Sequence, residues 1–207
     1  KADYYYRFAN KLWNAVRFVH TNIFKEEDTE IHLDLDTIKA DIQDNMEKLN
    51  HFDKWMLGKV NMVIEESGRM FSDYHLGQFG DSVINMVWGD FCDWYIEIVK
   101  PRLYSDDTLA KQTALYTLTY VLEKILKLLH PYMPFITEEI YTHLPTVEGS
   151  IVIAQFPHYN EADNMAKEEE MMNLTMDGIR NIRNVRAEMN VPPSKKAKVI
   201  IVQIGRA

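Results

Sequence analysis

One face of an expected N-terminal helix carries side chains that could bind single-stranded RNA. They recur every three or four residues and so form one stripe: Arg7, Asn10, Lys11, Asn14, Arg17, Phe18 and Thr21. Cationic side chains pair with phosphates, amides read base edges, and an aromatic ring stacks on an unpaired base. The stretch between Tyr4 and Lys25 contains no Asp or Glu. The pattern fits RNA binding, and it fits equally well an alternative in which Phe18 packs under a neighbouring loop and the amides are ordinary surface.

A second, smaller basic cluster lies near the other end of the chain. Arg180 and Arg183 share a face of an expected helix, and Arg186 lies to one side of it. These three residues are secondary candidates for contacts with an RNA backbone, although nothing in their spacing predicts base recognition. Solubility, or charge balance against the run Glu168–Glu170, explains them as well.

The charge distribution separates the two ends from the middle. The chain has a net charge of −8, but residues 4–25 carry +4 and residues 178–207 carry +6. Residues 26–177 hold 29 acidic and 11 basic side chains, a net charge of −18. Basic ends can attract a polyanion locally, whereas charge runs are usually solvated faces. The alternative function is therefore a helical protein-interaction domain that presents its acidic middle to a basic partner.

No catalytic or metal-binding motif stands out. Gly77–Gly80 has the wrong spacing for a phosphate-binding loop, and Cys92 is alone, so it cannot form a zinc knuckle. Glu138, Glu139 and His143 lack the second Glu-x-x-His copy that a carboxylate-bridged metal pair needs. We therefore predict no catalytic residue, no metal site and no cofactor in this chain.

Composition predicts an ordinary globular protein of one large domain, with or without a small appendage. Of its 207 residues 46% are apolar and 26% charged, and one cysteine excludes an internal disulfide. No apolar run reaches the roughly 20 residues of a membrane span, and the N-terminus lacks the apolar core of a signal peptide. We expect a cytoplasmic monomer that binds neither membranes nor DNA.

The elements that must position these side chains are mainly helices. Apolar residues recur at helical spacing in four long segments, approximately residues 5–23, 52–74, 84–99 and 115–129. Pro101 predicts that the third helix ends or kinks near Lys100, and Pro131 and Pro134 separate the fourth from a short helix over 135–144. Residues 26–36 are acidic and loop-like, with a short alternating pattern that could pair as a strand. Successive amphipathic helices joined by short breaks predict a helical bundle over residues 1–148.

The pattern changes after Gly149. A polar helix is expected from about Asn160 to Met189, stopped by Pro192 and Pro193, and the β-branched run over 198–204 predicts a strand. Residues 149–207 therefore form a small α+β appendage in this prediction.

Four blocks of the sequence resemble a known family. Residues 8–19 (FANKLWNAVRFV) and 91–97 (FCDWYIE) are similar to two helices of the anticodon-binding domain of valyl-tRNA synthetases. Residues 129–141 (LHPYMPFITEEIY) resemble a block that the valyl, isoleucyl and leucyl enzymes share, and residues 186–193 (RAEMNVPP) again resemble the valyl enzymes.

The resemblance implies a helical bundle of the class I synthetase anticodon-binding type. It implies a piece of a valine–tRNA ligase, which charges valine-accepting tRNA with valine using ATP and Mg²⁺. The signature motifs HIGH and KMSKS are absent, so the chain alone is expected to be inactive and to recognise tRNA only. By this resemblance Lys11, Arg17 and Phe18 contact the anticodon loop, and Asn10 and Asn14 assist. The resemblance assigns no role to residues 26–46.

Overall fold

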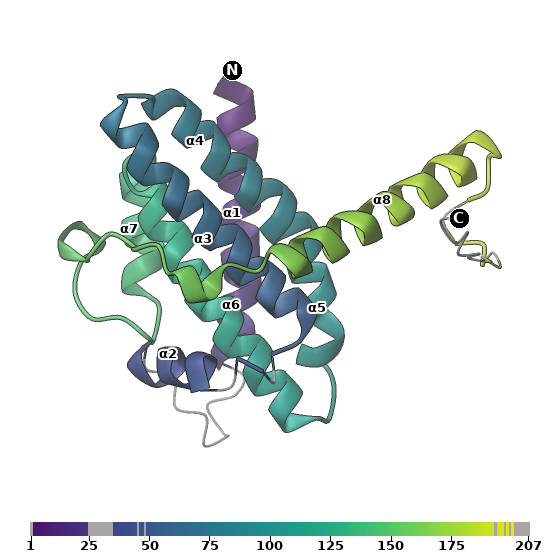
Figure 1. The fold of residues 1–207 in the computed structure, drawn as a ribbon, viewed down its shortest axis with the longest axis horizontal. Helices are drawn as coiled ribbons and strands as arrows, with labels where there is room; N and C mark the ends of the chain where they lie inside the picture. Colours follow the sequence, from purple (N-terminus) through teal and green to yellow (C-terminus); the bar gives the residue numbers. More distant parts are fainter. Residues whose placement is uncertain are drawn as a thin grey trace. The chain divides into compact units, whose positions relative to one another are not determined.

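The computed structural model describes residues 2–24, 35–44, 46, 47, 49–192, 194–196, 198 and 200. Two compact units divide the chain, Lys1–Glu169 and Glu170–Ala207. Helices dominate the described residues, among which no strand occurs (Figure 1). Within this described part, no helix has both the length and the apolar character that crossing a bilayer requires.

The first unit is a bundle of helices. They are α1 (Ala2–Phe24), α2 (Leu35–Asp44), α3 (His51–Ser72), α4 (Leu76–Asn85), η1 (Met86–Tyr95), α5 (Ile96–Leu103), α6 (Thr108–Leu129) and α7 (Pro134–Thr142). Two short 3₁₀ turns follow, η2 (Ile151–Ile153) and η3 (Glu161–Asp163). The last helix, α8 (Ala166–Glu188), begins at the end of the first unit and makes up most of the described second unit.

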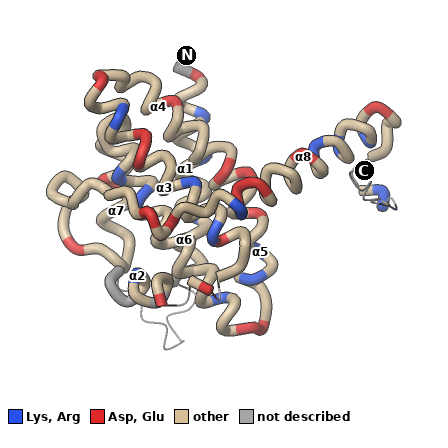
Figure 2. Tube along the Cα trace, viewed as in Figure 1, with Lys and Arg blue, Asp and Glu red and all other residues tan. Residues whose placement is uncertain are grey.

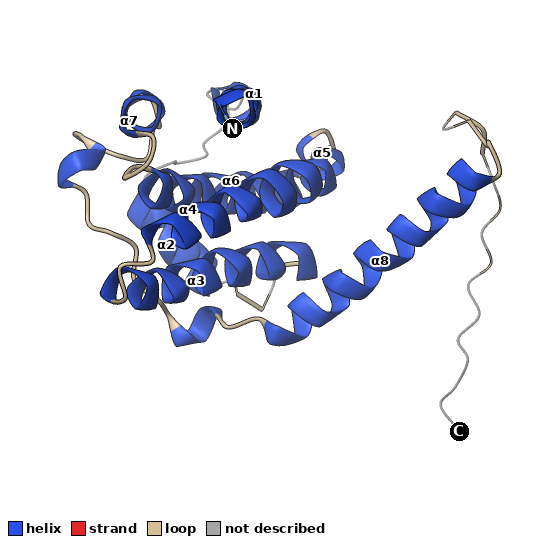
Figure 3. Ribbon diagram, turned by 90° about the horizontal axis from the view of Figure 1, so that it is seen from above, coloured by secondary structure: helices blue, strands red, loops and turns tan. Residues whose placement is uncertain are grey.

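Helix α6 is the centre of the bundle. It packs against α1, α2, α3, α4, α5 and α7, and its residues Ala114–Glu123 are all buried. A helix that is buried all round must satisfy its own polar groups, and the hydroxyls of Thr117 and Thr119 donate to the carbonyls of Thr113 and Leu115 at 2.9 and 2.8 Å. Helices α1 and α7 lie on one side of α6 and α3 lies on the other (Figure 3). The predicted helical bundle is confirmed.

Helix α6 begins at Thr108, seven residues before the apolar repeat that the sequence shows. Asp107 is the N-cap, and its carboxylate accepts a hydrogen bond from the Ala110 amide at 3.0 Å. Helix α3 begins in the same way, because the Asn50 side chain accepts from the Asp53 amide at 2.8 Å.

The region that the sequence presented as an acidic loop contains a helix. Residues 26–34 lie outside the described residues, but Leu35–Asp44 form α2. Ile38 and Ile42 of this helix, one turn apart, are buried, and α2 packs against α6. The prediction of a loop up to residue 36 is therefore wrong at its last two residues, because burial against α6 stabilises the helix.

The strand predicted over residues 198–204 lies mostly outside the described residues. Lys198 and Ile200 are described and neither is in a strand, whereas the polar helix predicted before it is present as α8. The α+β character of the C-terminal unit stays a prediction.

The third predicted helix is continuous from α4 through η1 to α5, and it passes its proline. Pro101 lies inside α5, which ends at Leu103, three residues beyond the position near Lys100 where the sequence predicted an end or a kink. A proline in the last turn removes one backbone donor, and the amide of Tyr104 still closes the turn on the Lys100 carbonyl at 3.1 Å. The middle of the helix is π-helical, and the Ile96 amide bonds the carbonyl of Phe91, five residues earlier.

Candidate nucleic-acid interface

Helix α1 turns its apolar stripe inwards and its polar stripe to solvent. Phe8, Leu12, Val19 and Ile23 are buried, and the helix packs against η1 and α6. The predicted RNA-binding residues lie on the opposite face of α1. Those that are exposed are Arg7, Asn10, Asn14, Arg17 and Thr21, while Lys11 and Phe18 are half-buried. The stripe expected from the sequence is thus a surface of the bundle.

Lys11 is held by residues of η1. Its Nζ lies 2.5 Å from the Asp93 Oδ1 and 4.5 Å from the centre of the Trp88 ring. The carboxylate offsets the charge of Lys11, so an RNA phosphate would have to compete with Asp93 for this ammonium group. Arg7 has a similar but looser contact, an ion pair with Asp3 at 2.9 Å in which both side chains are largely exposed.

Arg17 and Asn14 form one polar group on the outer face of α1. The Arg17 Nη2 donates to the Asn14 Oδ1 at 3.2 Å, across one turn of the helix. The Thr21 hydroxyl donates to the Arg17 carbonyl at 2.8 Å, and the Asn22 amide donates to the Phe18 carbonyl at 2.8 Å. The Arg17 guanidinium and the Asn14 side-chain amide therefore lie side by side on the surface.

A hollow of about 290 Å³ lies beside this group. It is lined by Asn14, Arg17, Phe18, Thr21, Asn22 and Tyr104. Tyr104 follows directly after α5 and its side chain is 64% exposed. The hollow therefore combines aromatic rings, a guanidinium and amides, which are the groups that hold an unpaired base. We name it the Phe18 hollow.

One residue that follows α5 lines this hollow and one residue of α5 lies near the Phe18 ring, and the sequence did not point to either. Tyr104 lines it, and the Lys100 Nζ lies 5.6 Å from the centre of the Phe18 ring, a cation–π distance. Both are more than 80 residues from Phe18, so no spacing rule joins them to the stripe. The sequence offered one signal for this site, an aromatic residue, Tyr104, immediately before the turn at Ser105.

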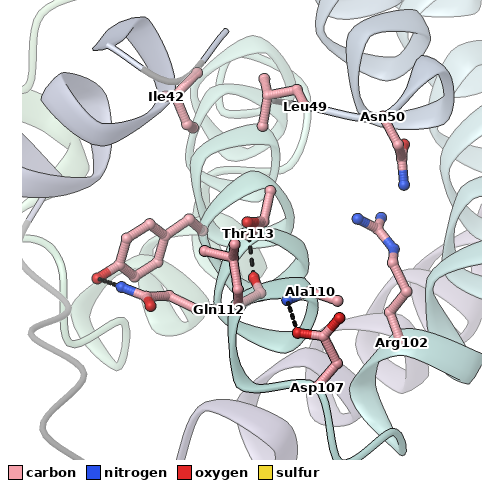
Figure 4. A pocket seen from close by; sticks show the side chains of 10 residues that line it. Ile42, Leu49, Asn50, Arg102, Asp107, Ala110, Gln112 and Thr113 are labelled. Carbon is pink, nitrogen blue, oxygen red and sulfur yellow. Dashed lines mark hydrogen bonds between the residues drawn. The ribbon is translucent and has the colours of Figure 1, made fainter. Parts of the chain in front are cut away.

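A larger cavity of about 360 Å³ lies elsewhere, beside the first turn of α6 (Figure 4). Its polar side chains already bond within the protein. Arg102 pairs with Asp53, Asp107 caps α6, and the Gln112 Nε2 donates to the Tyr116 hydroxyl at 2.9 Å. The cavity has none of the predicted RNA-binding residues in its wall, and we assign it no chemistry.

The three arginines of α8 belong to the second unit. Figure 2 shows basic residues in the later part of α8, after the acidic residues of its first turns. Arg180 pairs with Asp177 at 2.9 Å, and both are exposed. The Arg186 Nη2 donates to the carbonyls of Pro192 and Lys195 at 2.9 and 2.8 Å. Arg186 thus holds Pro192 and Lys195 close to the end of α8. Arg180 and Arg183 are exposed on α8.

Comparison with known proteins identifies the family of this chain. The family model for the anticodon-binding domain of tRNA ligase matches residues 53–201. The chain belongs to this family of anticodon-binding domains. The resemblance seen in the sequence is confirmed, and the match covers the helices from α3 through α8.

Individual relatives extend this similarity to α1. The chain is 47% identical to a valine–tRNA ligase of Clostridium perfringens over 193 residues, which are 93% of this chain and 21% of that protein. It is 41% identical to the valine–tRNA ligase of Bacillus cereus and 38% identical to that of Bacillus subtilis, each over 201 residues, 97% of this chain and 22% of the relative. An alignment of that length includes the polar stripe of α1. The chain spans about a fifth of the length of these relatives.

Proposed function

We propose that this anticodon-binding domain recognises the anticodon loop of a valine-accepting tRNA, as part of a valine–tRNA ligase. The observation that carries the proposal is the carboxylate-free stripe of α1 beside the Phe18 hollow, in a chain whose relatives are valine–tRNA ligases. Activation of valine with ATP and Mg²⁺ would take place in parts of the enzyme beyond this chain, in the cytoplasm. The chain itself would contribute recognition only.

Recognition would proceed through one unpaired base in the Phe18 hollow. The base stacks on Phe18, whose ring is flanked by Lys100, and Tyr104 closes the hollow from α5. Asn14 and Thr21 offer an amide and a hydroxyl to the base edge. Arg17 lies at the rim, where a phosphate of the same nucleotide passes. Such stacking contributes about 1–3 kcal/mol per base.

The remaining cations would hold the backbone on both sides of that base. Arg7 and Lys11 precede Arg17 on α1, and their ion pairs with Asp3 and Asp93 are exchangeable for phosphates because these carboxylates are exposed. Asn10 lies between them on the same stripe. We keep Arg180, Arg183 and Arg186 as secondary backbone contacts, carried by the appendage that follows residue 148.

The test is binding of the 207-residue chain to unmodified valine tRNA and isoleucine tRNA at low salt, followed by fluorescence anisotropy. Phe18→Ala and Arg17→Ala should each weaken valine tRNA binding about fivefold or more. Phe52→Ala and Arg69→Ala are the matched controls, because both residues are exposed on α3, which lies across α6 from α1. They should leave the affinity unchanged.

The outcome also separates the alternative function. An RNA-binding surface loses affinity steeply as salt rises, because bound phosphates release counterions. A protein-interaction domain would bind neither tRNA, and substitutions on α1 would not matter to it. Equal affinity for the two tRNAs would contradict the specificity for valine tRNA while leaving RNA binding intact.

A further inference from the structure

A second groove follows the other flank of α1, where this helix faces α7. Its floor is apolar and consists of the buried side chains of Val16, Ile140 and Leu144. Its volume is about 210 Å³. The indole of Trp13 stands at its wall and is 46% exposed. An apolar floor beside a large exposed aromatic ring is a surface on which a flat ring can lie.

Arg17 lines both this groove and the Phe18 hollow. Trp13 precedes Arg17 by one helical turn and Phe18 follows it directly, so the two aromatic residues lie on opposite flanks of the arginine. Along the helix axis, Trp13 and Phe18 are separated by about 7.5 Å, five residues at 1.5 Å each. One guanidinium thus stands between two aromatic platforms.

The rim of the groove carries groups that can bond a base edge. The His143 Nδ1 lies 2.7 Å from the Glu139 carbonyl oxygen, so in the neutral ring Nδ1 carries the proton and donates to it. That tautomer leaves Nε2 as an acceptor. The Glu139 carboxylate is largely exposed and can accept from an exocyclic amino group or a ring N–H. The rim therefore favours a base that presents donors.

We infer that the α1–α7 groove binds a second unpaired base of the RNA, stacked on Trp13, next to the base in the Phe18 hollow. The phosphate that joins the two nucleotides would lie on Arg17. A nucleic acid is the occupant that fits, because two flat rings joined by an anion match two aromatic platforms joined by a cation. A helix of a protein partner would need an apolar stripe, and the outer face between the grooves is polar. The inference rests on the proposed RNA function.

The test uses a hairpin RNA with the anticodon stem and loop of valine tRNA, with 2-aminopurine placed at one loop position at a time. Stacking on an aromatic side chain quenches this fluorophore. Phe18→Ala should restore fluorescence at one loop position, and Trp13→Ala should restore it at an adjacent position. Trp13→Ala should also weaken binding about fivefold or more, and Trp13→Phe should retain most of the quenching.

Phe135→Ala is the matched control, because Phe135 is an aromatic residue at the start of α7, is 89% exposed and does not line the groove. Thermal melting of each variant shows whether Trp13→Ala has loosened the packing of α1 on α7, and Trp13→Phe keeps the test valid in that case. If Phe18→Ala acts and neither Trp13 variant changes any position, the second subsite is wrong and the proposed function stands. If the unsubstituted chain binds no hairpin, both are overturned.

Discussion

The buried Asp53 of α3 and the partly buried Arg102 near the end of α5 form a two-pronged ion pair. The Arg102 Nη1 lies 2.7 Å from the Asp53 Oδ2 and its Nη2 lies 2.5 Å from the Oδ1. The Tyr95 hydroxyl also donates to the Oδ1, at 2.7 Å. Burial raises the pKa of Tyr95, and the neighbouring carboxylate of Asp53 raises it further. The cluster fixes the end of α5, and Tyr104 of the Phe18 hollow is only two residues beyond Arg102.

Breaking this pair should strongly destabilise the first unit. Asp53→Asn leaves the Arg102 guanidinium without its counter-charge, and such changes typically cost about 3–5 kcal/mol. Urea unfolding followed by circular dichroism measures the loss. Arg7→Met breaks the exposed pair with Asp3 and is the control, with an expected change within about 1 kcal/mol. Equal effects of the two substitutions would show that burial does not strengthen the Asp53 pair.

Removal of Asp93 should improve RNA binding. Asp93→Asn frees the Lys11 ammonium for a phosphate, and we expect affinity for valine tRNA to rise by up to about fivefold at low salt. The slope of log affinity against log salt should steepen by about one. Glu65→Gln makes the same charge change at an exposed site on α3 and controls for net charge. An affinity that rises equally in both variants would mean that Asp93 acts only through overall charge.

Cys92 should make folding stability depend on alkaline pH. Burial raises the pKa of its thiol to about 12, against an ordinary value of 9.0, with Lys11 lowering it and Asp93 raising it. Above pH 9 the unfolded chain loses this proton while the folded chain retains it, so stability falls as pH rises from 9 towards 12. Between pH 8 and pH 10.5, Cys92→Ala should lose less unfolding free energy than the unsubstituted chain, by on the order of 1 kcal/mol. Parallel loss in both proteins would contradict the pKa shift.

Two glycines of α3 should respond in opposite ways to alanine. A Cβ on Gly58 would lie 2.9 Å from the Met165 Cβ. Gly58→Ala therefore pushes Met165 away from α3 and should lower the free energy of unfolding by about 1–3 kcal/mol. A Cβ on Gly68 would have no atom of the described residues within 4 Å of it, so Gly68→Ala should stabilise the helix by up to about 1 kcal/mol. The melting temperatures of the two variants test both signs. A stabilising Gly58→Ala would show that residues 164–166 can move away from α3.

The amino-acid sequence predicted the helices that carry a long apolar stripe, because burial on α6 requires that stripe. It did not predict α2, whose ten residues offer only a short apolar repeat, Ile38 and Ile42, within an acidic region. Helix α5 continues three residues beyond Lys100, because its last turn tolerates Pro101 and still closes on the Lys100 carbonyl. Local spacing decides where a helix can form, and tertiary contacts decide where it ends.

The candidate site was predicted on one helix only. The stripe from Arg7 to Thr21 follows from spacing along α1, and its outward orientation follows from the apolar stripe beside it. Its partners could not be found in this way, because Lys11 meets Asp93 across 82 residues and Phe18 meets Lys100 across a similar separation. Contacts of this kind depend on how helices pack, which no period in the sequence encodes.

The π-helical stretch Met86–Tyr95 makes the recognition surface depend on how many residues the chain contains, as well as on which ones. Each residue of a helix turns the chain by roughly 100°, so a single deletion in this stretch would rotate α5 by about that angle if the remaining residues kept their present winding. Lys100 and Tyr104 would then face away from α1, although every side chain of the site were unchanged. If the proposed function holds, insertions and deletions between residues 86 and 95 would therefore alter RNA binding as substitutions at Phe18 would.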